Sequence, residues 1–188
     1  CHLLGNICLI DAKPVLFNGI EFNTDFSYID VVYDLACTIM DLDFHDQRRF
    51  ASILLNRYLD VTGEIALTPH TLDVLPLFLS MRAATRAHVG AAQAKDMSSC
   101  DDRAQEIANS EGYLRLANSY LHPPSPMLIA VGGLSGSGKS RIARELAPFY
   151  GSAPGAPVVR TDAVRKRISG VRQEDRLGAE GYTTEMHV

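Results

Sequence analysis

A glycine-rich stretch constrains the fold of this chain more than any other feature. Residues 133–140 read GLSGSGKS and fit the pattern G-x-x-x-x-G-K-[ST] in full. The apolar run 127–131 precedes it directly, and a helix-forming segment, 140–150, follows it. Glycines let backbone N–H groups crowd around phosphate oxygens, and a helix N-terminus adds about half a positive charge. The pattern therefore predicts a phosphate-binding loop between a strand and a helix.

Every residue of this loop is predicted to contribute to nucleotide binding. Lys139 is expected to reach the β- and γ-phosphates and to act in catalysis, and the Ser140 hydroxyl is expected to bind Mg²⁺. ATP and Mg²⁺ are therefore the expected cofactors, although the loop alone does not define a reaction. The predicted nucleotide contacts are Gly133, Leu134, Ser135, Gly136, Ser137, Gly138, Lys139 and Ser140.

The order of elements around the loop predicts an α/β fold with a parallel sheet. Strands are expected at 127–131 and 157–160, and helices at 140–150 and 163–169. The segment HPPSP at 122–126 cannot continue a helix and is predicted to be a stiff linker. We therefore place one domain at 1–121 and a P-loop NTPase domain at 127–188.

Asp162 is a second candidate for chemistry. It follows the expected strand 157–160, and ligands bind at the carboxyl ends of strands in open α/β sheets. A carboxylate there can accept a proton from a hydroxyl that attacks the γ-phosphate, and Arg165 is one helical turn away to bind phosphate. The alternative is that Asp162 only caps the helix that begins at Ala163, and the two roles are compatible.

The first half of the chain is predicted to be mainly helical after a short β-hairpin. The hairpin joins 8–10 to 14–17, and a further extended piece is expected at 19–22. Helices are expected from Ile29, around 50–59, over 71–95, and from a cap at Asp101 or Asp102 to Leu121. The pair Arg82 and Arg86 is interpreted as a solvated helix face.

Composition and charge exclude several classes of function. The net charge of −4, without a run of Lys or Arg, argues against nucleic acid or an anionic membrane as partner. The four cysteines have no zinc-site spacing and are interpreted as reduced thiols of a cytoplasmic protein. Because the chain opens with Cys1 and ends at Val188 without a closing element, we expect a piece of a longer protein, truncated at both ends.

The second half resembles P-loop kinases of the group that contains gluconate kinase, polynucleotide kinase and zeta-toxin-like proteins. The resemblance rests on the loop 133–140 and on a D-x-x-R segment, Asp162-Ala163-Val164-Arg165. It implies phosphotransfer from ATP, with Asp162 as base and Arg165 as a phosphate contact. The lid and remaining strands of such enzymes would lie past Val188.

The first half resembles the C-terminal part of aminoglycoside phosphotransferases. Asn6 matches the end of their H-G-D-x-x-x-x-N loop, Glu21 in Ile20-Glu21-Phe22 stands where the family has a metal-binding Asp, and 30–36 resembles their G-D-P-x-x-D-L-A segment. The resemblance implies that Asn6 and Glu21 bind Mg²⁺. The alternative is a helical domain with exposed acidic residues.

Together the halves resemble bacterial bifunctional proteins that join an aminoglycoside phosphotransferase-like domain to an ATP-binding P-loop kinase-like or AAA-type ATPase domain. This implies an ATP-binding, Mg²⁺-dependent phosphotransferase or ATPase that acts on an unknown acceptor. Two alternatives remain: the P-loop senses nucleotide for a kinase-like domain, or the chain is a truncated, non-catalytic nucleotide-binding remnant. The sequence does not predict the oligomeric state.

Overall fold

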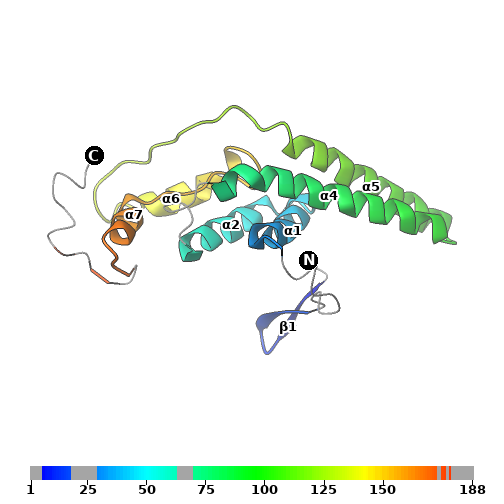
Figure 1. Cartoon of the computed structure of the whole chain (residues 1–188), viewed down its shortest axis with the longest axis horizontal. Helices are drawn as coiled ribbons and strands as arrows, with labels where there is room; N and C mark the ends of the chain where they lie inside the picture. The colour runs from blue at the N-terminus through cyan, green and yellow to red at the C-terminus, as the bar shows by residue number, and fades with distance from the viewer. Residues whose placement is uncertain (1–5, 18–28, 63–69, 173–174, 177, 179–188) are drawn as a thin grey trace.

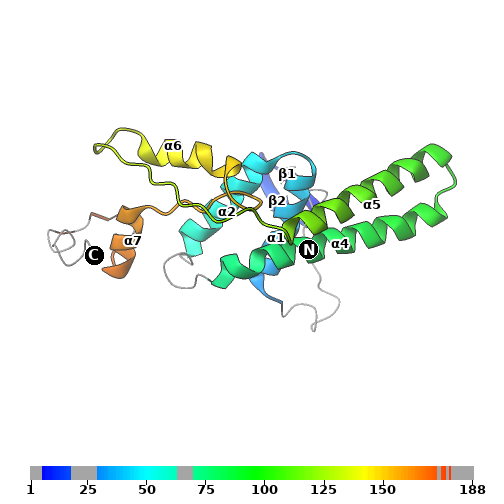
Figure 2. The same cartoon turned by 90° about the horizontal axis from the view of Figure 1, so that it is seen from above.

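The computed structural model describes residues 6–17, 29–62, 70–172, 175–176 and 178. The described chain is mostly helical, and its helices are distributed along the length of an elongated molecule (Figure 1). The long helices α4 and α5 form an antiparallel pair at one end, and the shorter α6 and α7 lie at the other. Viewed from above, the segment after α5 runs back along the molecule toward α6 (Figure 2).

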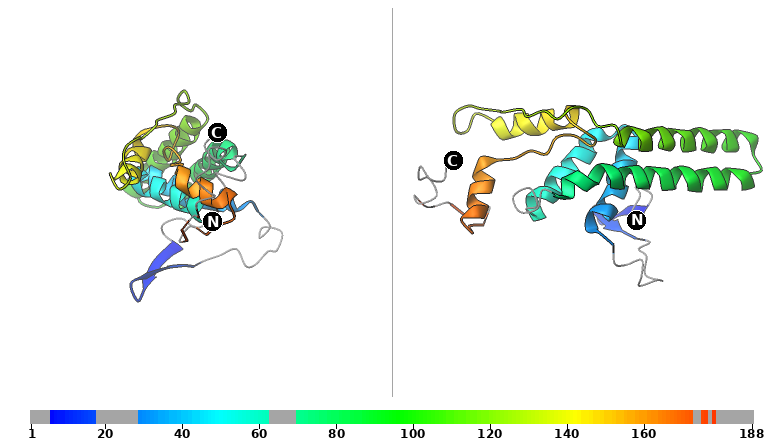
Figure 3. Two further views of the ribbon diagram at one scale, coloured as in Figure 1. Left: turned by 90° about the vertical axis from the view of Figure 1, so that its left-hand side faces the viewer. Right: turned by 45° about the horizontal axis from the view of Figure 1, so that its top comes forward.

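The predicted hairpin is confirmed and forms a two-stranded antiparallel sheet. Strand β1 (Ile7–Ile10) pairs with β2 (Lys13–Leu16) in the register Ile7 to Leu16. Asp11 and Ala12 connect them with φ values of 50° and 60°, the left-handed conformation of a tight two-residue turn. The hairpin lies apart from the helices (Figure 3), and most of its side chains are exposed. The extended piece expected at 19–22 lies outside the described residues.

Four helices form the body of the molecule where the sequence predicts them. They are α1 (Val31–Phe44), α2 (Arg48–Thr62), α4 (His70–Asp96) and α5 (Cys100–Tyr120). The Asp30 carboxylate caps α1 by accepting a hydrogen bond of 2.8 Å from Val32 N. The cap of α5 is Ser99, whose hydroxyl accepts from Asp102 N, so the prediction of an aspartate cap is wrong.

The core lies where α1, α2 and the first half of α4 meet the end of α5. Its side chains recur at helical spacing, so each helix buries one face. Helices α4 and α5 pack closely at Gly90, where an added Cβ would collide with the Glu106 and Ser110 side chains. The fully buried hydrophobic residues include Ala36, Ile39, Met40, Ala51, Leu55, Leu79 and Ala83.

The predicted α/β fold with a parallel P-loop sheet is wrong. Within the described residues the only sheet is the antiparallel hairpin, and neither 127–131 nor 157–160 forms a strand. The apolar run is instead largely in contact with solvent, with Leu128 95% exposed and Met127 70% exposed. A parallel strand must be flanked by other strands and covered by helices, and the described chain supplies neither to these segments.

The helices of the second half form without that sheet. Helix α6 (Lys139–Leu146) continues into a short 3₁₀ turn, η3 (Ala147–Phe149), and α7 (Thr161–Ile168) follows. The chain turns back after η3, and Ala156 N donates to Ala147 O at 2.8 Å. Gly155 has φ +136°, and a Cβ there would collide with the Ala147 carbonyl, so this turn requires glycine.

Two general expectations can be checked against the described chain. No helix in the described ranges is long and apolar enough to cross a membrane. Cys8 and Cys100 are free, but Cys37 is disulfide-bonded, so the interpretation of all cysteines as reduced thiols is wrong at Cys37.

Candidate phosphate-binding loop

The loop 133–140 has the backbone conformation that its glycines allow. Gly133, Gly136 and Gly138 have φ values of 151°, 78° and 83°, a region that side chains with a Cβ rarely adopt. Gly138 is the residue before α6, so Lys139 and Ser140 are its first two helical residues. The N–H groups of a first helical turn have no partner within the helix and carry partial positive charge.

The Ser137 and Lys139 side chains lie next to Gly133 in the loop. A Cβ added at Gly133 would lie 3.0 Å from the Ser137 hydroxyl and 3.7 Å from the Lys139 side chain. The Lys139 ammonium curls back over the loop and donates to Leu134 O at 2.5 Å. Ser137 N also donates to this carbonyl, at 3.3 Å. The loop therefore has a lysine, a serine hydroxyl and a glycine backbone within reach of one another, a donor set that suits an anion.

Helix α6 is attached to α2 by charged side chains. Arg49 on α2 donates from Nη2 to both carboxylate oxygens of Glu145, at 2.9 and 3.0 Å. Asp60, also on α2, has Arg144 and Arg160 each 3.9 Å away. These pairs link α2 to α6 and to the residue that precedes α7.

Helix α7 begins at the residues for which a catalytic role is predicted. Its N-cap is Arg160, without a side-chain cap bond, and Asp162 lies inside the first turn, so the alternative of Asp162 as the cap is wrong. The Asp162 side chain is 60% exposed and lies 3.6 Å from Lys166 Nζ. Arg165 lies one turn along the same helix. No hydrogen bond or ion pair between Asp162 and Lys139 occurs in the described chain.

Of the two metal ligands predicted for the first half, only Asn6 lies within the described residues. Asn6 is described, and its carbonyl accepts a hydrogen bond from Phe17 N at 3.0 Å beside the hairpin. Glu21 lies outside the described residues. A cluster of three or more His, Cys, Asp or Glu side chains suited to a metal does not occur in the described ranges.

Sequence reasoning missed polar contacts between distant segments, one set between the two halves and one within the first half. Asn56 on α2 accepts from Val158 N at 2.7 Å and donates to Ala156 O at 3.3 Å. Arg82, interpreted as solvated, has an 11% exposed side chain that stacks 3.8 Å from the Tyr33 ring and donates to Tyr33 O. No local motif marks such residues, because their partners lie 49 to 102 residues away along the chain.

Two tyrosines of α5 bind carboxylates of α1. Tyr113 Oη donates to Asp41 Oδ1 at 3.2 Å, and Tyr120 Oη donates to Asp43 Oδ2 at 2.9 Å. Burial, reinforced by the nearby Asp41 charge, raises the pKa of Tyr113 to about 12. Burial, with the charge of Asp43, also raises the pKa of Tyr120 well above its usual value. Both tyrosines therefore remain protonated donors at neutral pH.

Comparison with known proteins gives relatives whose names state no activity. The chain is 30% identical over 166 residues to the uncharacterized protein Rv2004c of Mycobacterium tuberculosis and to the uncharacterized protein Mb2027c of Mycobacterium bovis. The match covers 88% of this chain and 31% of each relative, so the chain spans about a third of the length of these proteins. No model of a known protein family matches the chain, and no solved structure matches it.

Proposed function

We propose that this protein binds Mg²⁺·ATP through residues 133–140 and acts as a phosphotransferase or ATPase on an acceptor that is still to be identified. The observation that carries the proposal is the complete G-x-x-x-x-G-K-S pattern at the first turn of α6, with its three glycines at positive φ. The resemblance to bifunctional kinase-like proteins supports the same function. A cytoplasmic location, where ATP is available, is part of this proposal.

The residues of the loop suit the phosphates of a nucleotide. The Lys139 ammonium, which now donates to Leu134 O, would exchange that neutral acceptor for a charged phosphate oxygen, a stronger partner. The N–H groups at the start of α6 would donate to the same phosphates. Mg²⁺ binds nucleotides with few protein ligands, so the Ser140 hydroxyl and the phosphates themselves would hold it.

Asp162 is the proposed acceptor of the proton from the attacking hydroxyl, with Arg165 on the same helix as a phosphate contact. The support is chemical: an exposed carboxylate and a guanidinium one turn apart on α7. The parallel sheet that first suggested this role is absent from the described chain. The proposal for Asp162 therefore needs a test separate from that of the loop.

Calorimetric titration of the full chain with Mg²⁺·ATP tests the binding step. We expect Lys139→Ala to weaken binding by about 10- to 100-fold, because it removes a hydrogen bond to a charged group. Lys13→Ala, an exposed lysine of β2, is the matched control and should bind as the unchanged chain does. Failure of the unchanged chain to bind Mg²⁺·ATP at millimolar concentration would overturn the proposed function.

Phosphate release and acceptor labelling from ATP test the reaction step. Asp162→Asn should keep nucleotide binding and lower turnover by about 10²- to 10⁴-fold, the usual effect of losing a general base. Asp175→Asn, another exposed aspartate, should change neither. Equal turnover in Asp162→Asn would exclude the proposed base, and binding without turnover in the unchanged chain would restrict the function to nucleotide binding.

A further inference from the structure

Helix α2 contacts the second half of the chain with polar side chains at its start and near its end. At its start, Arg48 donates to Gly151 O at 3.2 Å, and Arg49 donates to both carboxylate oxygens of Glu145 on α6. Near its end lies Asp60. The same end of α2 points toward α7 (Figures 1 and 2).

Asp60 places one carboxylate between two arginines of different elements. Its Oδ2 atom lies 3.9 Å from Nη2 of Arg144, on α6, and its Oδ1 atom lies 3.9 Å from Nη2 of Arg160, the residue before α7. The Asp60 side chain is only 24% exposed, so dissolved salt screens these attractions less than it screens a fully exposed pair. Each oxygen faces its own cation, and the carboxylate therefore bridges the two elements.

These two elements carry the two parts of the proposed nucleotide site. Helix α6 begins at Lys139, the lysine of the phosphate loop, and Arg144 lies five residues further along the same helix. Asp162, the proposed base, lies two residues after Arg160 in the first turn of α7. Because no hydrogen bond or ion pair joins Asp162 to Lys139 among the described residues, the spacing between loop and base depends on what each helix is attached to.

The segment that leads from α6 to α7 is attached to the same side of α2. Asn56 precedes Asp60 by one helical turn, so the two side chains are neighbours on the helix surface. Asn56 accepts a hydrogen bond from Val158 N at 2.7 Å and donates to Ala156 O at 3.3 Å. Residues 156–160 therefore follow this side of α2 as far as the ion pair of Arg160 with Asp60.

We propose that Asp60 is a positioning residue of the nucleotide site, which fixes α6 and α7 relative to each other through Arg144 and Arg160. The inference rests on the proposed function, and it gives the first half of the chain a part in the reaction of the second. Phosphoryl transfer requires the hydroxyl held by its base to be aligned with the γ-phosphate. A displacement of about 1 Å can lower the rate by about 100-fold, so the attachment of the two helices matters for turnover.

Distances between spin labels on the two helices test the bridge without a reaction. The labels are attached at Arg141→Cys on α6 and Ser169→Cys at the end of α7, two exposed positions. The free cysteines are removed by Cys8→Ser and Cys100→Ser. Double electron–electron resonance should give a narrow distance distribution. In Asp60→Asn it should be about twice as wide, because an amide offers one oxygen to two guanidinium groups.

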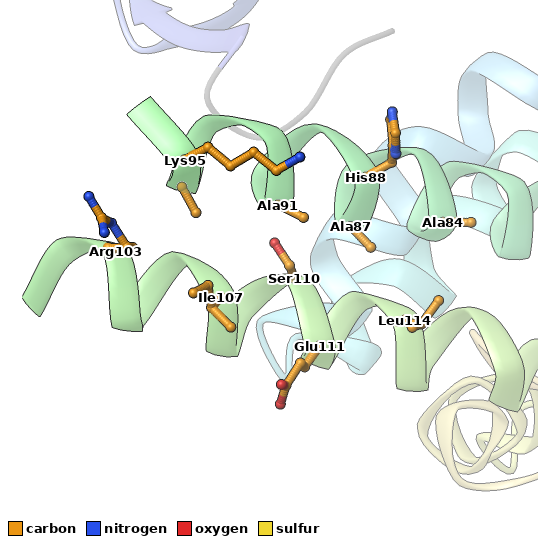
Figure 4. A pocket seen from close by; sticks show the side chains of 11 residues that line it. Ala84, Ala87, His88, Ala91, Lys95, Arg103, Ile107, Ser110, Glu111 and Leu114 are labelled. Carbon is orange, nitrogen blue, oxygen red and sulfur yellow. The ribbon is translucent and has the colours of Figure 1, made fainter. Parts of the chain in front are cut away.

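Glu111→Gln is the matched control for the loss of a carboxylate charge. Glu111 lies 3.7 Å from Arg115 and is on α5, beside the groove between α4 and α5 (Figure 4). This helix pair lies at the other end of the molecule from α6 and α7 (Figure 1). The control should therefore leave both the distance distribution and the turnover unchanged.

Turnover of ATP tests the consequence for the reaction. Asp60→Asn should lower kcat by about 10-fold and leave the Kd for Mg²⁺·ATP within about 2-fold, because the loop keeps all of its own residues. Asp60→Glu keeps the carboxylate and should recover most of the turnover. Arg160→Gln should have the effect of Asp60→Asn, and both changes together should lower kcat little further, since they remove the same bridge.

The two measurements separate this proposal from the proposed function. An unchanged distance distribution in Asp60→Asn would overturn the positioning role, and so would a kcat equal to that of the unchanged chain. A Kd for Mg²⁺·ATP that rises as much as kcat falls would also overturn it, because Asp60 would then act on the fold as a whole. Absence of turnover in the unchanged chain would overturn the proposed reaction, and the positioning role with it.

Discussion

The helical body, residues 31–62 and 70–120, buries a core of apolar side chains, whereas most of the large apolar side chains in the segment that follows it, 121–172, are exposed. In the body, Leu79 and Ile39 are completely buried. In the following segment, Leu128 is 95% exposed and Leu134 is 85% exposed. The chemistry of these side chains is the same, so the difference lies in the neighbours that the chain provides for them.

The comparison shows how helices and strands differ in their dependence on distant partners. A helix satisfies its own backbone hydrogen bonds and needs only one covered face, which α1, α2, α4 and α5 provide for one another. A strand in a parallel sheet needs neighbours for its backbone and covering layers for both faces. In the described chain the run 127–131 has no such neighbours, and it is extended without pairing.

The largest expected effect is a difference in stability between the same leucine-to-alanine change made in each of the two regions. Leu79→Ala should lower the free energy of unfolding by about 2 to 5 kcal/mol, because it leaves a cavity in the core. Leu128→Ala removes the same atoms from an exposed position and should change stability by less than about 0.5 kcal/mol. Chemical denaturation followed by circular dichroism measures both.

Of these two variants, Leu128→Ala is the stricter test of the structure. A loss of about 2 kcal/mol or more in Leu128→Ala would mean that 127–131 is packed in solution, contrary to the structure. A small effect in both variants would mean that the described core contributes little to stability.

The helical body could be predicted from the sequence because its signals are local. The spacing of residues such as Val32, Ala36 and Ile39 defines a buried face within one element, and Asp30 is a typical cap. The hairpin could be predicted from signals that are equally local, because four residues on each side flank a two-residue turn.

The second region could not be predicted in the same way. The loop 133–140 and the helix after it are local features and were recognised. The parallel sheet is a long-range arrangement that was inferred from element order, and element order does not show whether enough strands are present. The contacts of Asn56 with Ala156 and Val158 span about a hundred residues, so no sequence window contains both partners.

The buried tyrosines should give the helical body a specific sensitivity to alkali. The pKa of Tyr113 is 10.0 when unfolded and about 12 when folded, so the stabilisation is complete below pH 10 and decreases as the pH rises toward 12. Each pH unit in this window removes at most about 1.4 kcal/mol through Tyr113 alone, and Tyr120 acts in the same direction.

Urea denaturation at several alkaline pH values measures this effect. The double variant Tyr113→Phe with Tyr120→Phe should be less stable at pH 7, because Asp41 and Asp43 lose donors, but its stability should fall less between pH 10 and 12. An equally steep fall in the double variant would assign the alkaline sensitivity to other groups.

The smallest expected effect concerns the attachment between the two regions. Asn56→Ala removes the acceptor of Val158 N and the donor to Ala156 O, and should cost about 1 kcal/mol. Hydrogen exchange at the Val158 amide should accelerate by about 5-fold, while the amide of Leu79 in the core should be unaffected. Asn118→Ala, at an exposed position of α5, is the matched control and should change neither amide.

Because the segment after α5 buries so little apolar surface of its own, its order near Val158 depends on contacts of this kind. Equal acceleration at both amides would mean instead that the two regions unfold as one unit, and the contrast between them would then apply to exposure but not to stability.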